Sequence, residues 1–392
     1  MNSSGIRTVF LKEVVDNLRD RRTLMSALFF GPLFGPLIFG FMISMALERN
    51  IKDVDEPLEL PVIGAEYAPN LVAWLETQNV VIQASPEDAE AVVRDGDVAV
   101  VLEIPEDFGD AFRNGEPATL RLILDDSSQD GEKDRRRIRA LLRGYGQQVG
   151  ALRLLARGVH PDTTDPIALE EIDLSTPAGR GVLILGMIPY FLIFSILMGA
   201  FNLAIDTTAG ERERGSLEPL LTVPVSRTRI MLGKLAATAV FSIAAMTISL
   251  LAFSVSISFV PLEKVGMAAN FGLDVMLSAA LICLPFVALG VALLTVVAAF
   301  TKTYKEAQTY LSFVLIVPLI PVIVAAVDPV RPTVLTMLVP SLSQHLLITE
   351  FMKGEPVAPL LIATSVLSTL LIGGALTWVA ARLYRRERLL GG

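Results

Sequence analysis

Few side chains of this sequence stand at a spacing that covalent chemistry requires. The string nearest to a phosphate-binding loop runs from Gly210 to Gly215 and Ser216, and it lacks the lysine that contacts phosphates. Ser343 lies close to His345, but no Gly-x-Ser-x-Gly motif places either residue on a nucleophile elbow. We therefore expect no catalytic residue on this chain.

The residues that bind metals are equally sparse. The two histidines, His160 and His345, stand in separate predicted loops without a cysteine or histidine at zinc-ligand spacing. The single cysteine, Cys283, lies in an apolar stretch, where core packing is its expected role, and it has no partner for an intrachain disulfide. We expect neither a metal site nor a cofactor on this chain.

A few polar residues lie within or beside long apolar stretches, where polarity is a reason to suspect function. They form our candidate translocation pathway: Asn202, Asp206, Asp274, Gln308 and Tyr310. The alternative is that polar side chains in such stretches only bond helix backbones or hold neighbouring helices together.

Those apolar stretches must cross a membrane. The chain has 392 residues, of which 52% are hydrophobic and 19% charged, and a mean hydropathy of +0.56. Crossing a bilayer core of roughly 30 Å takes about 20 apolar residues in a helix. Six stretches are long enough, and Lys234 is the only Asp, Glu, Lys or Arg within them: Leu24–Leu47, Val182–Ile205, Met231–Phe259, Val275–Phe300, Gln308–Val327 and Val357–Ala381.

Basic residues predict the orientation, because short cytoplasmic loops carry an excess of Lys and Arg. Sixteen lie in residues 1–23, in the loop after the second stretch, in the loop after the fourth, and in the tail 382–392, whereas the opposite short loops hold only Lys264, Arg331 and Lys353. The sequence therefore predicts a multi-pass protein of the bacterial inner membrane with six transmembrane helices and both termini cytoplasmic.

Residues 48–178 are predicted to form an extracytoplasmic α/β domain. They carry 27 acidic and 13 basic residues, and they alternate between strand and helix patterns. We expect strands at Leu60–Ile63, Val80–Gln83, Val98–Leu102 and Leu120–Leu124, with helices near 70–78, 86–95, 105–113 and 132–157. The first apolar stretch, 24–47, is longer than a signal-peptide core, which favours a spanning helix over a cleaved signal.

Three further segments complete the organisation. Residues 1–23 alternate apolar and charged side chains, as in a helix that lies in the inner interface. Residues 182–381 hold the remaining five spans, with a cytoplasmic segment at 206–230. Residues 328–356 are interrupted by Pro332, Pro340 and polar side chains, so they are expected to form short helices that cap or re-enter the outer side.

The cytoplasmic segment carries the most specific pattern in the chain. Residues 211–227 read ERERGSLEPLLTVPVSR, and this string resembles the coupling segment of type 2 ABC exporter permeases, in which ERExG[ST]LExLLxxP[VI][ST]R follows the second span. The residues to which the resemblance assigns contact with an ATPase are Glu211, Arg212, Glu213, Arg214, Gly215, Ser216, Leu217, Glu218, Leu221, Pro224 and Arg227.

The resemblance covers essentially the whole chain, and the large domain after the first span is most similar to NatB-like permeases. It implies a non-catalytic permease that forms a homodimer, a separate ABC ATP-binding subunit that binds ATP and magnesium, and sodium efflux as the activity. It implies no nucleic-acid partner. A lipid, peptide or antibiotic exporter, and a membrane sensor or scaffold with an external ligand domain, remain the alternatives.

Overall fold

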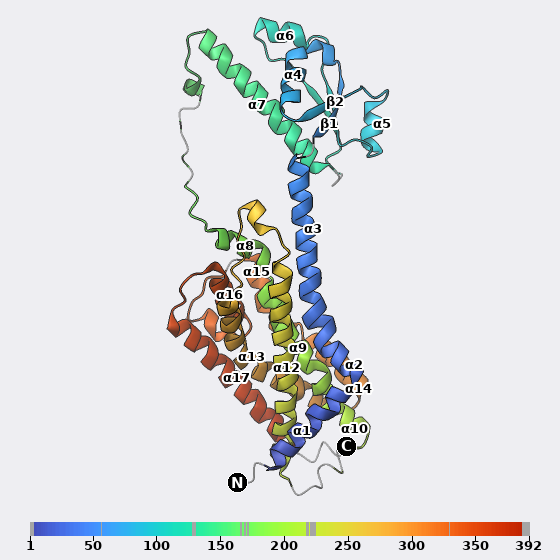
Figure 1. The fold of residues 1–392 in the computed structure, drawn as a ribbon, viewed down its shortest axis with the longest axis vertical. Helices are drawn as coiled ribbons and strands as arrows, with labels where there is room; N and C mark the ends of the chain where they lie inside the picture. Colours follow the sequence, from blue (N-terminus) through green and yellow to red (C-terminus); the bar gives the residue numbers. More distant parts are fainter. Residues whose placement is uncertain are drawn as a thin grey trace. The chain divides into compact units, whose positions relative to one another are not determined.

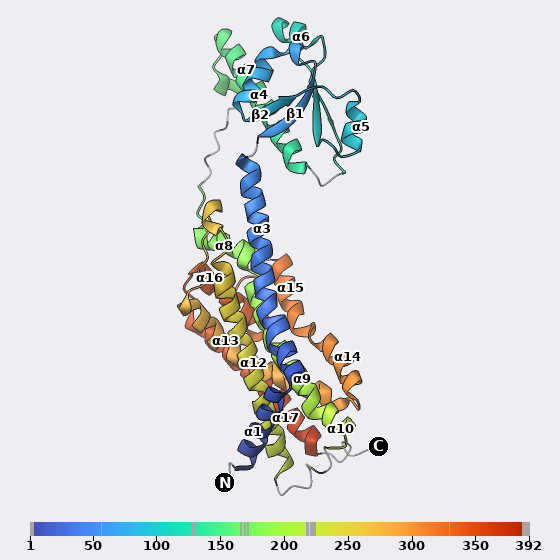
Figure 2. The same cartoon turned by 45° about the vertical axis from the view of Figure 1, so that its right-hand side comes forward.

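The computed structural model describes residues 4–55, 57–127, 131–164, 167, 170, 172–216, 219, 225–328 and 330–385. The chain divides into two compact units, one made of residues 1–51 and 174–392 and the other of residues 52–173. Figures 1 and 2 show both units as ribbons.

The first unit is helical, and its described residues include six helices long and apolar enough to cross a membrane: Met25–Arg49, Ile188–Glu213, Arg227–Ile257, Leu273–Phe300, Tyr304–Ala325 and Pro359–Tyr384. Each contains most of one of the six predicted stretches. Its elements are α1 (Ser4–Arg19), α2 (Arg21–Leu24), η1 (Met25–Phe34), α3 (Gly35–Asp55, which runs into the second unit), α8 (Pro177–Leu185), α9 (Ile188–Ile205), η4 (Asp206–Gly210), α10 (Glu211–Glu213), α12 (Arg227–Ile257), η5 (Leu262–Val265), α13 (Leu273–Phe300), α14 (Tyr304–Val314), η6 (Val317–Leu319), α15 (Ile320–Val327), η7 (Thr336–Leu338), α16 (Leu342–Lys353) and α17 (Pro359–Arg385).

The core of this unit lies where α9, α12 and α13 pack together, with buried Ile196, Phe253 and Phe286 at its centre. Glycines let the first span approach this core. A Cβ on Gly40 would overlap the Ser256 hydroxyl of α12, which donates to the Pro36 carbonyl oxygen at 2.9 Å. Here glycine permits close helix packing, which is its common use between spans.

The segment between the fifth and sixth spans forms η7 and α16, and most of α16 is buried. His345 is the fourth residue of α16, which lies in the segment 328–356 that the sequence predicts to form short helices. The neighbouring Gln344 is fully buried and its amide nitrogen donates to the Ser365 and Thr369 hydroxyls of α17 at 3.3 and 3.0 Å. Burial of this amide is tolerated because its hydrogen bonds are made within the fold.

The second unit is an α/β fold. Its elements are β1 (Leu58–Ile63), η2 (Ala65–Tyr67), α4 (Pro69–Thr77), β2 (Val80–Gln83), α5 (Ala89–Arg94), β3 (Val100–Glu103), α6 (Phe108–Asn114), β4 (Arg121–Leu124), α7 (Glu132–Ala156) and η3 (Pro161–Thr164). The sheet order is β2-β1-β3-β4, with β1 parallel to β2 and β3, and β4 antiparallel to β3.

The hydrophobic core of the second unit lies between the sheet and the helices α4 and α7, which lie side by side in both views (Figures 1 and 2). Leu60 and Leu102 come from the sheet, Leu75 from α4 and Ile138 from α7, and all four are fully buried. Arg135, which the sequence places in a basic run, is also buried, and its guanidinium lies 3.6 Å from the Asp126 carboxylate. A paired charge is the form in which arginine is tolerated at such a position.

Candidate functional site

The predicted coupling segment begins as a continuation of the second span. Beyond Ile205 the helix passes through the π-helical turn η4 into α10, and it ends at Gly215, whose φ is +67°. The Gly215 and Ser216 N–H groups donate to the Arg212 and Glu211 carbonyl oxygens at 3.1 and 3.0 Å. These two bonds form a Schellman ending, which satisfies carbonyls of the last turn.

A buried ion pair joins this extension to the third span. The Glu211 carboxylate bonds to the Lys234 ammonium, and these residues are only 6% and 2% exposed. Lys234 Nζ also donates to the Thr207 carbonyl oxygen at 2.8 Å, and the Tyr384 hydroxyl of α17 donates to that same oxygen at 3.2 Å. Glu211 is one of the residues to which the resemblance assigns contact with an ATPase, but its charge is used inside the protein.

Arg212 connects the same extension to the fourth span. Its guanidinium donates to the Ala299 carbonyl oxygen at 2.9 Å and to the Thr301 carbonyl oxygen. Both oxygens lie at the carboxyl end of α13, where carbonyls lack helical partners and a positive charge is favourable. Arg212 therefore holds the ends of α9–α10 and α13 together.

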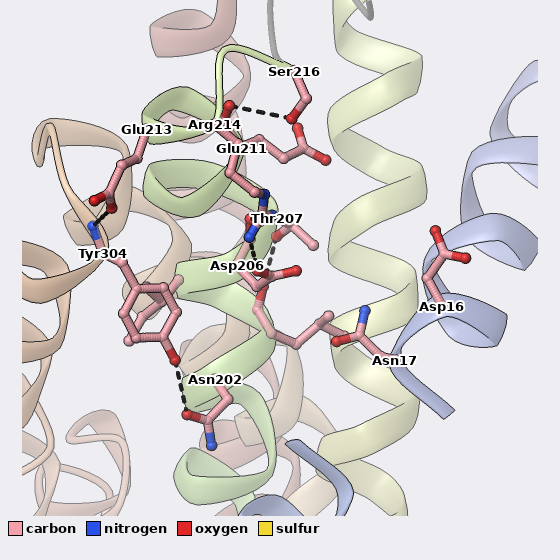
Figure 3. A network of polar contacts seen from close by, with 12 residues as sticks. Asp16, Asn17, Asn202, Asp206, Thr207, Glu211, Glu213, Arg214, Ser216 and Tyr304 are labelled. Carbon is pink, nitrogen blue, oxygen red and sulfur yellow. Dashed lines mark hydrogen bonds and ion pairs between the residues drawn. The ribbon is translucent and has the colours of Figure 1, made fainter. Parts of the chain in front are cut away.

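The next two charged residues, Glu213 and Arg214, form bonds at the surface of the turn, as Figure 3 shows. Arg214 bonds to the Asp206 carboxylate at 2.8 Å, and this hydrogen bond raises the pKa of the guanidinium. The Glu213 carboxylate accepts from the Tyr304 N–H at 2.6 Å, where α14 begins. The Tyr304 hydroxyl in turn donates to Asn202 Oδ1 at 3.5 Å.

We call this set the coupling network: Asn202, Asp206, Thr207, Glu211, Arg212, Glu213, Arg214, Lys234, Tyr304 and Tyr384. Its residues come from the second, third, fifth and sixth spans and from the start of the second-to-third connection, and Asn202 reaches the first span through Ser26 at 2.8 Å. Because Arg212 also bonds to the end of the fourth span, the network ties the extension of the second span to the other five spans.

The amino-terminal helix α1 packs against the same region. A Cβ on Gly233 would lie 2.9 Å from Val9 Cβ and 3.0 Å from the Ile6 carbonyl oxygen, so glycine is required for α1 to lie this close to α12. Glu13 and Asn17 of α1 are buried, and Lys12 bonds to Glu13 at 3.0 Å. The predicted interfacial helix is therefore also a packed part of the helical unit.

The other predicted contact residues, from Glu213 onward, lie at the surface or outside the described residues. Glu213, Arg214, Gly215 and Ser216 are exposed, and Arg227 is the first residue of α12. Leu217, Glu218, Leu221 and Pro224 lie outside the described residues.

The five residues of the predicted translocation pathway do not meet. Asn202 and Asp206 both belong to the coupling network, whereas Asp274 lies in the first turn of α13, at the opposite end of that helix from Thr301. A helix of 28 residues is roughly 40 Å long. Gln308 and Tyr310 are exposed on α14. The structure therefore brings Asn202 and Asp206 together and places Asp274 far from them, and it leaves Gln308 and Tyr310 on the helix that begins at Tyr304.

Sequence reasoning missed five residues of this region: Lys234, Thr207, Tyr304, Tyr384 and Glu13. Only Lys234 carries a usable signal, because it is the sole charged residue in the predicted spans, and a lysine there requires a partner. Thr207 acts through its backbone carbonyl oxygen. Every residue type has this atom, so the sequence gives no signal for its role. Tyr384 and Glu13 come from the two ends of the chain, and their proximity depends on the tertiary fold.

The part of the chain that is similar to known proteins includes both the site and the spans. Residues 21–382 match the model of the family described as ABC-2 family transporter protein. The chain is also 25% identical over 365 residues to the ABC transporter permease protein NatB of Bacillus subtilis strain 168, an alignment that covers 91% of this chain and 92% of that protein. The permease components of this family are non-catalytic membrane subunits that work with an ATP-binding subunit. With its six membrane-spanning helices and a family match over nearly its whole length, this chain belongs to the ABC-2 family of transporter proteins.

Proposed function

We propose that this permease exports sodium ions, driven by ATP hydrolysis on a separate subunit that docks at residues 206–230. Family membership supports the permease role, and the layout that resembles NatB-like permeases supports sodium as cargo. Moving one positive charge outward costs about 2.3 kcal/mol per 100 mV of membrane potential. No nucleotide-binding motif is present in the sequence, so ATP and magnesium would bind to the partner.

One observation carries the coupling part of this proposal. The exposed end of the α9–α10 extension, at Glu213 to Ser216, is bonded through the coupling network to the ends of α12, α13, α14 and α17. A force applied to this end would reach these spans through short, charge-assisted contacts rather than through a slack loop. This is the property that a docking site for a moving ATPase requires.

The same reasoning gives the topology that we propose. The coupling network, both termini and their basic residues face the cytoplasm, and the α/β unit lies outside the bacterial inner membrane. Two permeases work with two ATPases. The first, fifth and sixth spans are mostly exposed within one chain, which leaves apolar surface for lipid and for a second copy.

The test uses the permease and its ATPase together in proteoliposomes. Internal or external sodium is varied against potassium at constant ionic strength, and both ATP hydrolysis and vectorial flux are measured. Stimulation by sodium with net flux supports the proposal. Equal rates in both salts would reject sodium and leave the permease role, which would direct attention to lipid, peptide or antibiotic cargo.

Docking is tested separately by charge reversal on the exposed turn. Arg214→Glu is expected to weaken ATPase binding and to lower coupled hydrolysis by about tenfold. The reason is that reversal of a charge at the rim of an interface changes the binding free energy by roughly 1 kcal/mol or more. Glu263→Lys is the matched control, since Glu263 is exposed in η5 in the loop between the third and fourth spans. Equal behaviour of the two variants would contradict docking at this turn.

A further inference from the structure

The α/β unit contains a cavity of about 410 Å³, and none of its lining residues belongs to the coupling network. It is lined by aromatic and acidic side chains, chiefly Tyr67, Phe108, Phe112, Tyr145, Glu66 and Glu106. All of them belong to the second unit, so the cavity is formed within one compact body.

The position of this cavity follows from the topology of the sheet. Glu66 and Tyr67 follow β1, and Glu106 and Phe108 follow β3, so the cavity lies at the carboxyl ends of these two parallel neighbours. The chain leaves β1 towards β2 on one side and leaves β3 towards β4 on the other. Open α/β sheets bind ligands in the crevice at such a switch point.

The backbone holds these two loops close together. Gly64, with φ +73°, follows β1, and a Cβ there would lie 2.2 Å from the Ile104 carbonyl oxygen. Ile104 N–H donates to the Ile63 carbonyl oxygen at 2.9 Å. The Tyr67 hydroxyl then donates to the Glu106 carboxylate at 3.0 Å, which joins the two loops across the cavity and raises the pKa of the phenol.

The lining has the chemistry of a site for an organic cation. Aromatic faces attract ammonium groups, and a nearby carboxylate adds a Coulombic term. The one lining guanidinium, that of Arg113, is occupied by Asp110 at 2.5 Å and by the Gly109 carbonyl oxygen at 3.1 Å. Arg153 already lies 4.7 Å from the centre of the Phe112 ring, so a ring of this cluster does accept a cation.

We propose that this cavity binds a small organic ammonium ion, with the aromatic rings of Tyr67 and Tyr145 around the cation and Glu106 as its counter-charge. An anion would meet two glutamates here. A metal ion would need more ligands than the cavity offers, and within the described residues no group of three His, Cys, Asp or Glu side chains is placed to hold one. The inference does not rest on sodium as cargo, and either proposal can fail without the other.

The test is a titration of the full-length chain in a maltoside detergent with choline chloride, at constant ionic strength. The chain carries Trp378→Phe, so that Trp74 is its only indole, and Trp74 lies 5.2 Å from the Tyr145 ring of the cavity. The comparison compound is 3,3-dimethylbutan-1-ol, which has the shape of choline and no charge. We expect a saturable change in Trp74 fluorescence with choline at millimolar concentration and none with the alcohol.

A charge-matched pair of variants assigns the effect to the cavity. Glu106→Gln keeps an acceptor for the Tyr67 hydroxyl and is expected to weaken choline binding by about fivefold, the loss of one screened charge near 4 Å. Glu90→Gln, an exposed glutamate of α5 outside the cavity, is expected to leave binding unchanged. If Glu106→Gln does not fold, the contrast between choline and its neutral analogue in the unaltered cavity still decides the question.

Three results would overturn the proposal: equal binding of choline and the alcohol, equal weakening by the two glutamine variants, and no saturable signal from choline. Phosphatidylcholine vesicles added in a further titration identify the source of the ammonium group. Displacement of choline by the vesicles indicates a lipid headgroup, and retention of choline indicates a soluble amine. Both of these results support recognition of an ammonium ion.

Discussion

The buried pair of Glu211 and Lys234 allows a quantitative prediction about stability. Replacement of Glu211 by glutamine leaves Lys234, which is 2% exposed, without its counter-charge, although the Thr207 carbonyl oxygen still accepts from it. Removal of one partner of a buried ion pair costs about 3 to 5 kcal/mol, because the remaining charge is desolvated and unpaired. We expect Glu211→Gln to lower the free energy of unfolding by about 3 kcal/mol, the lower end of that range, because of the remaining bond to Thr207.

Removal of both charges should cost far less than removal of one. Lys234→Met alone leaves Glu211 buried without its ion-pair partner, but the double variant Glu211→Gln, Lys234→Met removes both charges of the pair. We expect the double variant to be destabilised by about 1 kcal/mol, since buried pairs replaced by apolar groups are often nearly neutral. The interaction energy obtained from this double-mutant cycle is the quantity that tests the reasoning.

The assay is equilibrium unfolding of the purified permease in mixed detergent micelles, followed by circular dichroism. Asp16→Asn is the control, because Asp16 pairs with Lys12 at 3.6 Å on the surface, with both side chains more than half exposed. Exposed pairs of this kind contribute about 0 to 1 kcal/mol. Additive single-variant effects, or a Glu211→Gln effect no larger than that of Asp16→Asn, would refute a tightly coupled buried pair.

Three further predictions concern α1, α16 and α7. Gly233→Val should displace α1 from α12 and destabilise the unit by about 1 to 3 kcal/mol, measured by unfolding and by faster proteolysis of α1, because the added carbons overlap Val9. Burial lowers the pKa of His345 to about 4, whereas the pKa of histidine in an unfolded chain is about 6.5. The free energy of unfolding should therefore keep its full value above about pH 6.5 and fall by roughly 2 to 3 kcal/mol as the pH drops towards 4. His345→Leu should abolish that part of the pH dependence. Gly144→Ala in α7, where a Cβ meets no atom within 4 Å, should stabilise the α/β unit by about 0.5 to 1 kcal/mol in thermal unfolding; a loss of stability would contradict the open space described here.

The spans could be predicted from the sequence because a membrane imposes one dominant requirement on every crossing helix. Long apolar stretches without charges are readily recognised in a sequence, and all six correspond to helices of the structure. The α/β organisation could also be predicted, because strands and helices differ in hydrophobic periodicity. The predicted strand Val98–Leu102 is shifted to Val100–Glu103, an error of two residues at a boundary where periodicity carries little information.

The coupling segment shows what residue type alone cannot convey. The string from Glu211 to Arg214 reads as a charged surface, but two of its four charges are directed inward, to Lys234 and to the end of α13. The sequence contains no local signal for this, since the partners are 23 and 89 residues away. Likewise, Asp274 and Asn202 are both polar residues at the edges of predicted spans. Only the fold shows that they lie apart by much of the length of α13.

The contact between Arg212 and the carbonyls of Ala299 and Thr301 has a consequence for motion. Separation of the second span from the fourth at this level would break the bonds of a partly buried guanidinium to two helix-end carbonyl oxygens, so these two helix ends should move together. Spin labels on these two spans near the arginine would then keep a constant separation throughout a transport cycle. A rearrangement that opens a path for cargo is then expected to leave these two helix ends in contact.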